Sequence, residues 1–259
     1  MLLMEGVLQA HGGQERWREK SFFSAHVSIS GTLLPPPSVR PPLGTVQVAV
    51  DGCRLAVAPR AKSTLRELVM EGDTRRPHVR IYGATDMTRY AVYTPSRTEF
   101  RSISGTLLEA QDDPVAAMAS RDPECPLVGL EQVLLFGSLV WRAVAEPFTL
   151  GLNGRSHELS RDPSYGHAGS ARLEITVPDT IDPVTPERRL TIGEEGYIRR
   201  AEYELRHFHR QTIAETLSAH ACFDGIVVPT LRRLQVVEPG GAIGRVPLID
   251  IEIFDVRFA

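Results

Sequence analysis

The sequence predicts an α+β protein whose main element is a large, curved antiparallel sheet, an incomplete β-barrel closed by a few helices. Three observations support this prediction: apolar and polar residues alternate over many short segments, turn residues separate these segments, and one long helix-like segment covers about residues 127–146. Sequential strands with tight turns favour a meandering antiparallel sheet, so the helices must pack on one of its faces. A sheet of this length curls, and we expect it to enclose an apolar groove or cavity.

The first half of the chain contains helix, then strands. Residues 2–20 have a helical pattern that is interrupted at Gly12-Gly13, where one helix would end and a second begin. Apolar residues then alternate along 23–33. The same alternation returns at 46–50 and 53–57, and Asp51-Gly52 between them predicts a hairpin. The remaining strands of this half are expected near 64–70, 78–82, 89–94 and 97–103.

The second half begins with the most apolar stretch, 133–141, which is shorter than the roughly 20 residues that a bilayer span requires. It is therefore expected to be a buried helix. The segment before it, 112–126, contains Asp-Pro twice and is expected to be a break between the strand-rich first half and this helix. Strands are expected near 148–159, 171–177, 188–192, 197–207, 215–223, 230–238 and 247–258. Because apolar patterning continues on both sides of each break, one domain is expected over residues 1–259.

Composition disfavours several kinds of partner and chemistry. The 259 residues include 29 basic and 32 acidic ones, a formal net charge of -3, so neither nucleic acid nor anionic lipid is attracted broadly. The only lysines are Lys20 and Lys62, which limits amine catalysis to two residues. No dinucleotide, P-loop, GxSxG or HExxH motif is present, so no cofactor is expected. The start lacks the features of a secretory signal, and the three cysteines are widely separated, which favours the cytosol.

Both ends and the centre of the chain resemble a known group of proteins. Residues 10–17, before a strand, and 223–230 and 250–258, around a hairpin, are similar to an uncharacterised bacterial family with the fold of the LolA/LolB lipoprotein carriers. Phe136-Gly137, Trp141 and 196–200 extend the similarity to the middle. The resemblance implies an incomplete barrel with a helical plug and an apolar cavity, which in the carriers holds acyl chains. The same motifs also have plain structural interpretations from position rules, with Gly225 in a turn and Pro229 at the start of a strand.

Three residues are candidate catalytic groups. Tyr203 shares the predicted core face of its strand with Ala201 and Leu205, and a phenol inside a cavity can donate a hydrogen bond or relay a proton. A core tyrosine with a backbone partner is the alternative interpretation. His220 is predicted to face away from the core. It is exposed if that face is convex, and if a helix covers the face, His220 and His26 become candidate bases.

Aromatic residues, histidines and arginine pairs are further candidates for binding sites. Five aromatic residues could line an apolar pocket or simply form core: Tyr82, Tyr90, Tyr93, Phe100 and Trp141. His207 and His209 have the spacing of metal ligands on one strand face, but Arg206 and Arg210 beside them indicate a solvated tip, and no metal site is expected. Arginine pairs such as 188–189 and 232–233 are expected on solvated strand faces.

Two functions remain open at this stage. One is a cytosolic, cofactor-independent isomerase, cyclase or lyase that acts on an apolar biosynthetic intermediate. The other is a non-catalytic carrier or sensor of a lipid or acyl ligand. An enzyme needs an inward titratable group held by hydrogen bonds, whereas a carrier can have a uniformly apolar wall, and Tyr203 favours the enzyme. The oligomeric state stays open.

Overall fold

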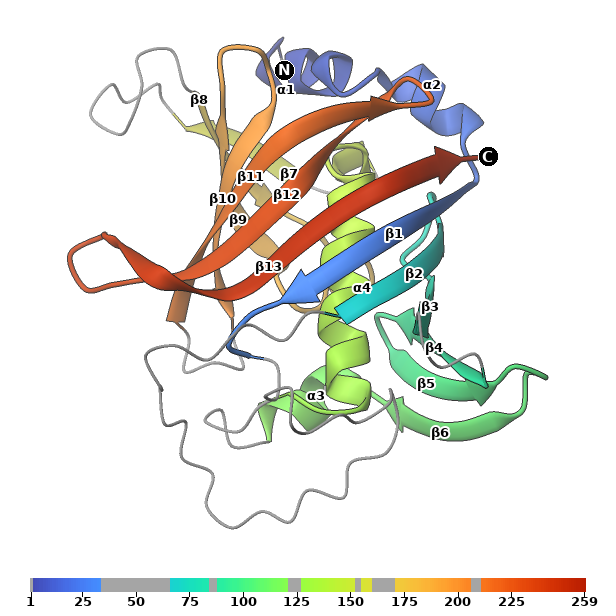
Figure 1. Ribbon diagram of the computed structural model, residues 1–259. Coiled ribbons are helices and arrows are strands. Elements are labelled where there is room, and N and C mark those ends of the chain that lie inside the picture. Colours follow the sequence, from blue (N-terminus) through green and yellow to red (C-terminus); the bar gives the residue numbers. More distant parts are fainter. Residues whose placement is uncertain are drawn as a thin grey trace.

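The computed structural model describes residues 2–33, 66–83, 88–120, 127–151, 155–159, 171–205 and 211–259. The predicted hairpin at 46–57 and the histidines at 207 and 209 lie outside the described residues. Within them, 13 strands form one antiparallel sheet in the order β6-β5-β4-β3-β2-β1-β13-β12-β11-β10-β9-β8-β7 (Figure 1). The sheet is open, with β6 and β7 at its two edges. It consists of two meanders, β1 to β6 and β7 to β13, which are joined where β1 pairs with β13.

The elements agree with most of the predicted ranges. The helices are α1 (Leu2–Ala10), α2 (Gln14–Glu19), α3 (Pro114–Ala119), α4 (Leu130–Ala145) and the 3-10 helix η1 (Phe148–Gly151). The strands of the first meander are β1 (Phe22–Ser30), β2 (Arg66–Asp73), β3 (Val79–Gly83), β4 (Arg89–Thr94), β5 (Arg97–Ser102) and β6 (Leu107–Asp112). Those of the second are β7 (Arg155–Leu159), β8 (Ala171–Thr176), β9 (Glu187–Ile192), β10 (Ile198–Leu205), β11 (Gln211–Phe223), β12 (Ile226–Val237) and β13 (Ile243–Phe258).

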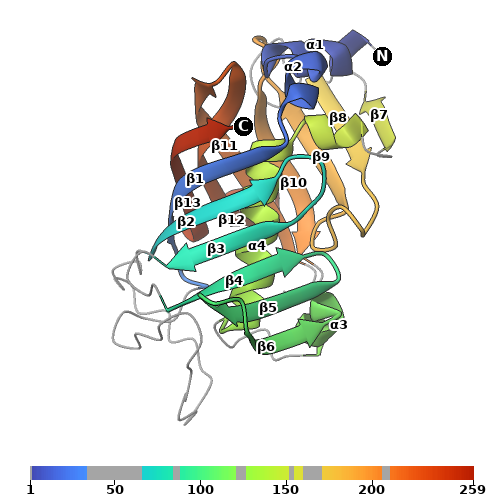
Figure 2. The same cartoon turned by 90° about the vertical axis from the view of Figure 1, so that its right-hand side faces the viewer.

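The sheet curls around α4, so that its concave face packs on this helix (Figures 1 and 2). Every residue of α4 from Gln132 to Ala145 is buried, and the helix contacts β3, β4, β5 and β12. Along the strands, buried residues on the concave face alternate with more exposed residues on the convex face. In β1 the odd-numbered residues from Phe23 to Ile29 are buried against the helix side, as the sequence predicts. None of the described helices has the length and apolarity to cross a membrane.

The break between α1 and α2 falls at Gly12-Gly13, which confirms the predicted interruption. Gly12 has φ 114°, and a Cβ built on it would lie 2.2 Å from the carbonyl oxygen of Gly225. The backbone amide of Val227 donates to the His11 carbonyl nearby, at 3.0 Å. Only a glycine allows the chain to turn this close to the β11–β12 hairpin.

Two predictions about elements are wrong, and one helix was not predicted. Residues 148–159 are not one strand: Phe148 begins η1, because its ring is buried and stacks on Trp17 with ring centroids 4.6 Å apart. Pro229 does not start a strand, since Asp224 and Gly225 both have positive φ and form a tight turn that lets β12 begin at Ile226. The segment 112–126 contains α3, whose start is capped by Asp113 through the backbone amide of Ala116.

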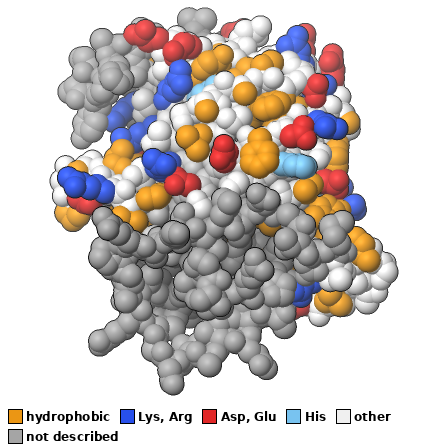
Figure 3. All heavy atoms as spheres, viewed as in Figure 1, with side chains coloured by type: hydrophobic (Ala, Val, Ile, Leu, Met, Phe, Trp, Pro, Cys, Tyr) orange, Lys and Arg blue, Asp and Glu red, His pale blue; other side chains and the backbone are white. Residues whose placement is uncertain are grey.

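The sequence also failed to predict β6. All of its residues except Gln111 are exposed, so the strand shows no alternation between apolar and polar positions. The convex face over β1, β12 and β13 mixes charged, histidine and hydrophobic side chains without segregating them (Figure 3). On this face Arg233 pairs with Asp250 at 2.7 Å.

Candidate functional site

Polar residues form a buried stripe on one side of α4. Ser138, Arg142 and Glu146 follow each other at intervals of four residues, so they lie above one another on the same side of the helix. All are buried, and they face the second meander of the sheet. Charged side chains are almost never fully buried without partners, so the contacts of this stripe define a site.

Arg142 is the centre of these contacts. Its Nη2 donates to Glu215 Oε2 at 2.5 Å and to the Tyr203 hydroxyl at 3.1 Å, and its guanidinium lies 4.8 Å from the centre of the Tyr203 ring. Its Nη1 donates to the hydroxyl of Thr185. The helix is therefore bound through one side chain to β10, β11 and the loop before β9.

Glu215 is shared between two guanidinium groups. Its Oε2 also accepts a hydrogen bond from the Tyr203 hydroxyl at 3.0 Å, and its Oε1 accepts one from Arg232 Nε at 2.6 Å. Burial by itself would raise the pKa of Glu215, but the charges of Arg142 and Arg232 outweigh burial and hold the pKa below its ordinary value. Glu215 is thus a buried, ionised carboxylate.

Asp182 forms the other end of the charged group. It accepts hydrogen bonds from Arg188 Nη1 at 2.5 Å and from the backbone amides of Val184 and Thr185. Arg188 Nη2 lies 3.1 Å from Glu146 Oε1. We call the six charged residues of this region the ionic cluster: Arg142, Glu146, Asp182, Arg188, Glu215 and Arg232.

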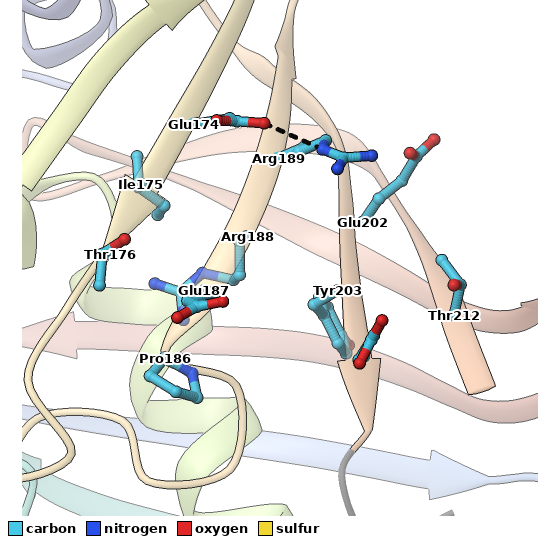
Figure 4. Close-up of a pocket in the computed structure, with 11 residues that line it drawn as sticks. Glu174, Ile175, Thr176, Pro186, Glu187, Arg188, Arg189, Glu202, Tyr203 and Thr212 are labelled. Atoms are coloured by element: carbon cyan, nitrogen blue, oxygen red, sulfur yellow. Dashed lines mark hydrogen bonds and ion pairs between the residues drawn. The ribbon is translucent and has the colours of Figure 1, made fainter. Parts of the chain in front are cut away.

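A groove of about 320 Å³ opens beside the ionic cluster (Figure 4). Strands β9 and β10 pair as far as Arg189 opposite Glu202 and then separate, which leaves a gap in the sheet. Inward-facing Arg188 and Tyr203 line it together with outward-facing residues, so the groove involves both faces. Its lining residues are Glu174, Ile175, Thr176, Pro186, Glu187, Arg188, Arg189, Glu202, Tyr203, Glu204 and Thr212.

Comparison with solved structures shows that other proteins have a similar fold. A DUF1329 family protein from Desulfovibrio piger matches with a TM-score of 0.53 at 9% identity, over 99% of this chain and 92% of that chain. A LolA superfamily protein from Nitrosomonas europaea matches with a TM-score of 0.53 at 11% identity, over 98% and 92%. The fold is LolA-like. At these identities the likeness concerns the fold alone.

Sequence comparison adds nothing to this. No protein-family model matches the chain. No curated protein matches it either. The predicted fold class, an open antiparallel sheet with few helices and a LolA-like arrangement, is confirmed by the structure and by the solved neighbours.

Within this LolA-like fold, Tyr203 lies where the sequence places it, on the core face of β10 between Ala201 and Leu205. It is 3% exposed, lines the groove and touches the ionic cluster. Burial, followed by the charge of Glu215, raises the pKa of the phenol far above its ordinary value. Tyr203 is thus a neutral hydrogen-bond donor to Glu215, and its catalytic role stays a prediction.

The two histidines lie elsewhere. His220 is partly buried beneath the α1–α2 connection, where its ring stacks on Tyr197 at 4.7 Å and lies 6.2 Å from His11. Its Nε2 lies 3.1 Å from the Ile198 carbonyl oxygen. Burial, the charge of Arg199 and the neighbouring His11 lower the pKa of His220 to about 4. His26 is exposed on β1, its ring 6.2 Å from that of Phe254.

The five aromatic residues predicted to bind a ligand divide into two groups. Tyr93, Phe100 and Trp141 are buried core residues, and the Trp141 indole donates to the Asp73 carbonyl oxygen at 2.8 Å. Tyr82 and Tyr90 are half-buried neighbours with ring centroids 5.5 Å apart. None of the five lines the groove, so the structure does not bring them together with Tyr203.

Most residues of the ionic cluster could not be recognised as site residues from the sequence. The arginine pairs at 188–189 and 232–233 were expected on solvated faces, which is wrong for one member of each: Arg188 and Arg232 are buried, whereas Arg189 and Arg233 are exposed. Adjacent strand residues point to opposite faces, so one of each pair had to face the helix. Arg142, a charged residue directly after the most apolar stretch and within the predicted helix, was the other available signal.

Proposed function

We propose that the protein binds an apolar small molecule or acyl chain on the concave side of its sheet and acts as a carrier or sensor. The observation that carries the proposal is the position of α4. This helix occupies the space that the curled sheet would otherwise enclose, with contacts to β3, β4 and β5 in the apolar core and charged contacts from Arg142 to Glu215 and Asp182. A ligand that displaces part of α4 from the first meander would find an apolar wall there.

The fold gives independent support. One solved neighbour is described as a LolA superfamily protein, and the resemblance of the sequence to the lipoprotein carriers implies an apolar cavity for acyl chains. Several concave residues of the first meander, such as Phe23, Met70 and Ile81, are apolar and at most 1% exposed. Such a wall suits a ligand without polar groups along most of its length.

Tyr203 favours a second candidate, a cofactor-independent isomerase, cyclase or lyase. Its hydroxyl faces inward and is held by Arg142 and Glu215, which is the arrangement that an enzyme needs. The protonation states favour the carrier, however. The pKa of the phenol is raised and that of Glu215 is lowered, so neither group exchanges a proton readily near neutral pH.

Extraction of the protein from its own host, followed by mass spectrometry, tests the binding function. We expect a co-purifying apolar molecule that rebinds to the stripped protein and changes its tryptophan fluorescence, since Trp141 lies on α4. A stripped protein that binds neither its extract nor acyl chains would rule out the carrier. The cytosolic location stays a prediction, and cell fractionation tests it.

Turnover of the extracted compound separates the two candidates. A carrier returns the compound unchanged. An enzyme converts it, and Tyr203→Phe then lowers kcat while binding persists. Tyr90→Phe, a half-buried tyrosine outside the groove, is the matched control and leaves kcat unchanged.

A further inference from the structure

Arg232 on β12 is fully buried, yet most of its guanidinium has no partner. Nε donates to Glu215 Oε1 at 2.6 Å. Among the described residues, Nη1 and Nη2 have no hydrogen-bond partner. Buried polar groups are almost always hydrogen-bonded, because an unpaired one loses its hydration without compensation. The two free nitrogens therefore indicate a partner that the described part of the chain does not supply.

The charge near Arg232 favours an anionic partner. At this end of the ionic cluster, Arg142 and Arg232 share the carboxylate of Glu215, at 2.5 and 2.6 Å, and Arg142 also lies 3.5 Å from Asp182 Oδ2. At the other end, the single guanidinium of Arg188 holds both Asp182 and Glu146, at 2.5 and 3.1 Å. The cluster is balanced as a whole, but among the described residues Arg232 pairs only with Glu215, a carboxylate that it shares with Arg142.

The surroundings of Arg232 limit what the partner can be. Leu217 and Ile251 lie opposite Arg232 on the two neighbouring strands, and both are buried. A guanidinium presents its terminal N–H groups as a planar fork that matches the two oxygens of a carboxylate. A carboxylate on an apolar body fits both the fork and the apolar wall around it.

We propose that Arg232 anchors the carboxylate of an apolar acid, such as a fatty acid, inside the half-barrel. The inference rests on the proposed binding function and adds the class of the ligand and its orientation, with the acid at β12 and the chain along α4. Bound water is the alternative partner for the two nitrogens. Water would give no preference for acids.

Calorimetric titration of the stripped protein with dodecanoic acid and with methyl dodecanoate tests the proposal. The two probes share one chain and differ in the charge of the head. We expect the acid to bind about tenfold more tightly, the effect of one charge-assisted bidentate contact. If neither probe binds, the proposed function fails. If both bind equally, the function stands and the anchoring role of Arg232 is overturned.

Variants locate the preference on Arg232. Arg232→Met is expected to reduce acid binding to the level of the ester and to leave ester binding unchanged. Arg233→Gln, the neighbouring outward-facing residue, is the matched control and keeps the preference. An acid preference that survives in Arg232→Met overturns the proposal. Should that variant not fold, Arg232→Lys, which keeps the charge but loses the fork, must bind the acid less tightly than the wild type does.

Discussion

At the scale of single residues, buried charges fix α4 in the sheet. Arg142 contacts Tyr203 on β10, Glu215 on β11 and Thr185 in the loop before β9. A buried ion pair gains little over an apolar contact of the same shape, because both charges lose their hydration. Removing one member is costly, however, since the other stays buried and unpaired. The cluster therefore specifies one position of the helix more than it adds stability.

Arg142→Met tests the cost of removing one member of the cluster. The change leaves Glu215 and Asp182 buried with fewer cationic partners, so we expect the free energy of unfolding to fall by about 3–5 kcal/mol. Urea denaturation followed by circular dichroism measures the loss. Arg189→Met, which removes an exposed ion pair with Glu174, is the control and should change stability by less than about 0.5 kcal/mol. Equal effects of both substitutions would contradict the assigned role.

His220 gives the protein a pH dependence of a defined sign. Its pKa is lowered from 6.5 to about 4 in the folded state, chiefly by burial, so the unfolded chain binds the proton more tightly. The stability that follows from a neutral His220 is complete above pH 6.5 and declines as the pH falls from 6.5 towards 4. Denaturation of His220→Gln at pH 7 and pH 5 should show a smaller decline than the wild type. His26→Gln, on the exposed face of β1, should keep the wild-type slope.

At the scale of elements, α4 has two sides that pack by different means. One side contributes Arg142 to the ionic cluster, with Glu146 directly after the helix. The other side places Gly137 against the ring of Tyr93 on β4. A Cβ built on Gly137 would lie 2.4 Å from Cβ and Cγ of Tyr93. The glycine therefore sets the distance between the helix and the first meander.

Gly137→Ala and Gly6→Ala should have opposite effects on stability. Alanine favours a helix over glycine by about 1 kcal/mol, and on α1 nothing lies within 4 Å of the Cβ built at Gly6, so Gly6→Ala should be neutral or stabilising. In α4 the clash with Tyr93 outweighs this preference, and we expect a loss of about 1–3 kcal/mol. Thermal denaturation compares the two. A stabilised Gly137→Ala would mean that α4 can move away from β4 at little cost.

The success of prediction from sequence differs among these elements. β1 and β10 are half-buried, so their alternation shows directly in the residues, and the buried face of Tyr203 followed from it. β6 could not be found in this way because it is exposed on both faces. Arg232 was predicted on a solvated face, which is wrong. The side of a strand that faces a helix depends on the arrangement of the whole sheet. The groove depends on where β9 and β10 separate, which no local pattern encodes.

At the scale of the whole molecule, the two meanders share one sheet and one helix. β1 pairs with β13 from Phe23 opposite Phe258 to Ser30 opposite Asp250, and α4 contacts strands of both meanders. We propose on this basis that residues 1–259 form one domain. One continuous hydrophobic core extends across β1 and β13. Neither meander would therefore keep its core without the other.

Cooperative unfolding is the expected outcome for one domain. Trp17 lies against Phe258, at the end of β13, whereas Trp141 is bound to the end of β2. In the variants Trp17→Phe and Trp141→Phe, the remaining tryptophan should report the same denaturation midpoint as circular dichroism does. Midpoints that differ between the two variants, after correction for each variant's own stability, would indicate two domains.

The strand order also has a consequence for synthesis on the ribosome. A chain is made from its N-terminus, so β1 emerges first of the described strands, while its partner β13 emerges after all the others. Until β13 emerges, one edge of β1 has no partner strand. Arg142 likewise lacks its partner Glu215, which follows it by 73 residues in the sequence. An unpaired strand edge can join another chain, so the nascent chain is exposed to aggregation through β1 until β13 has been made.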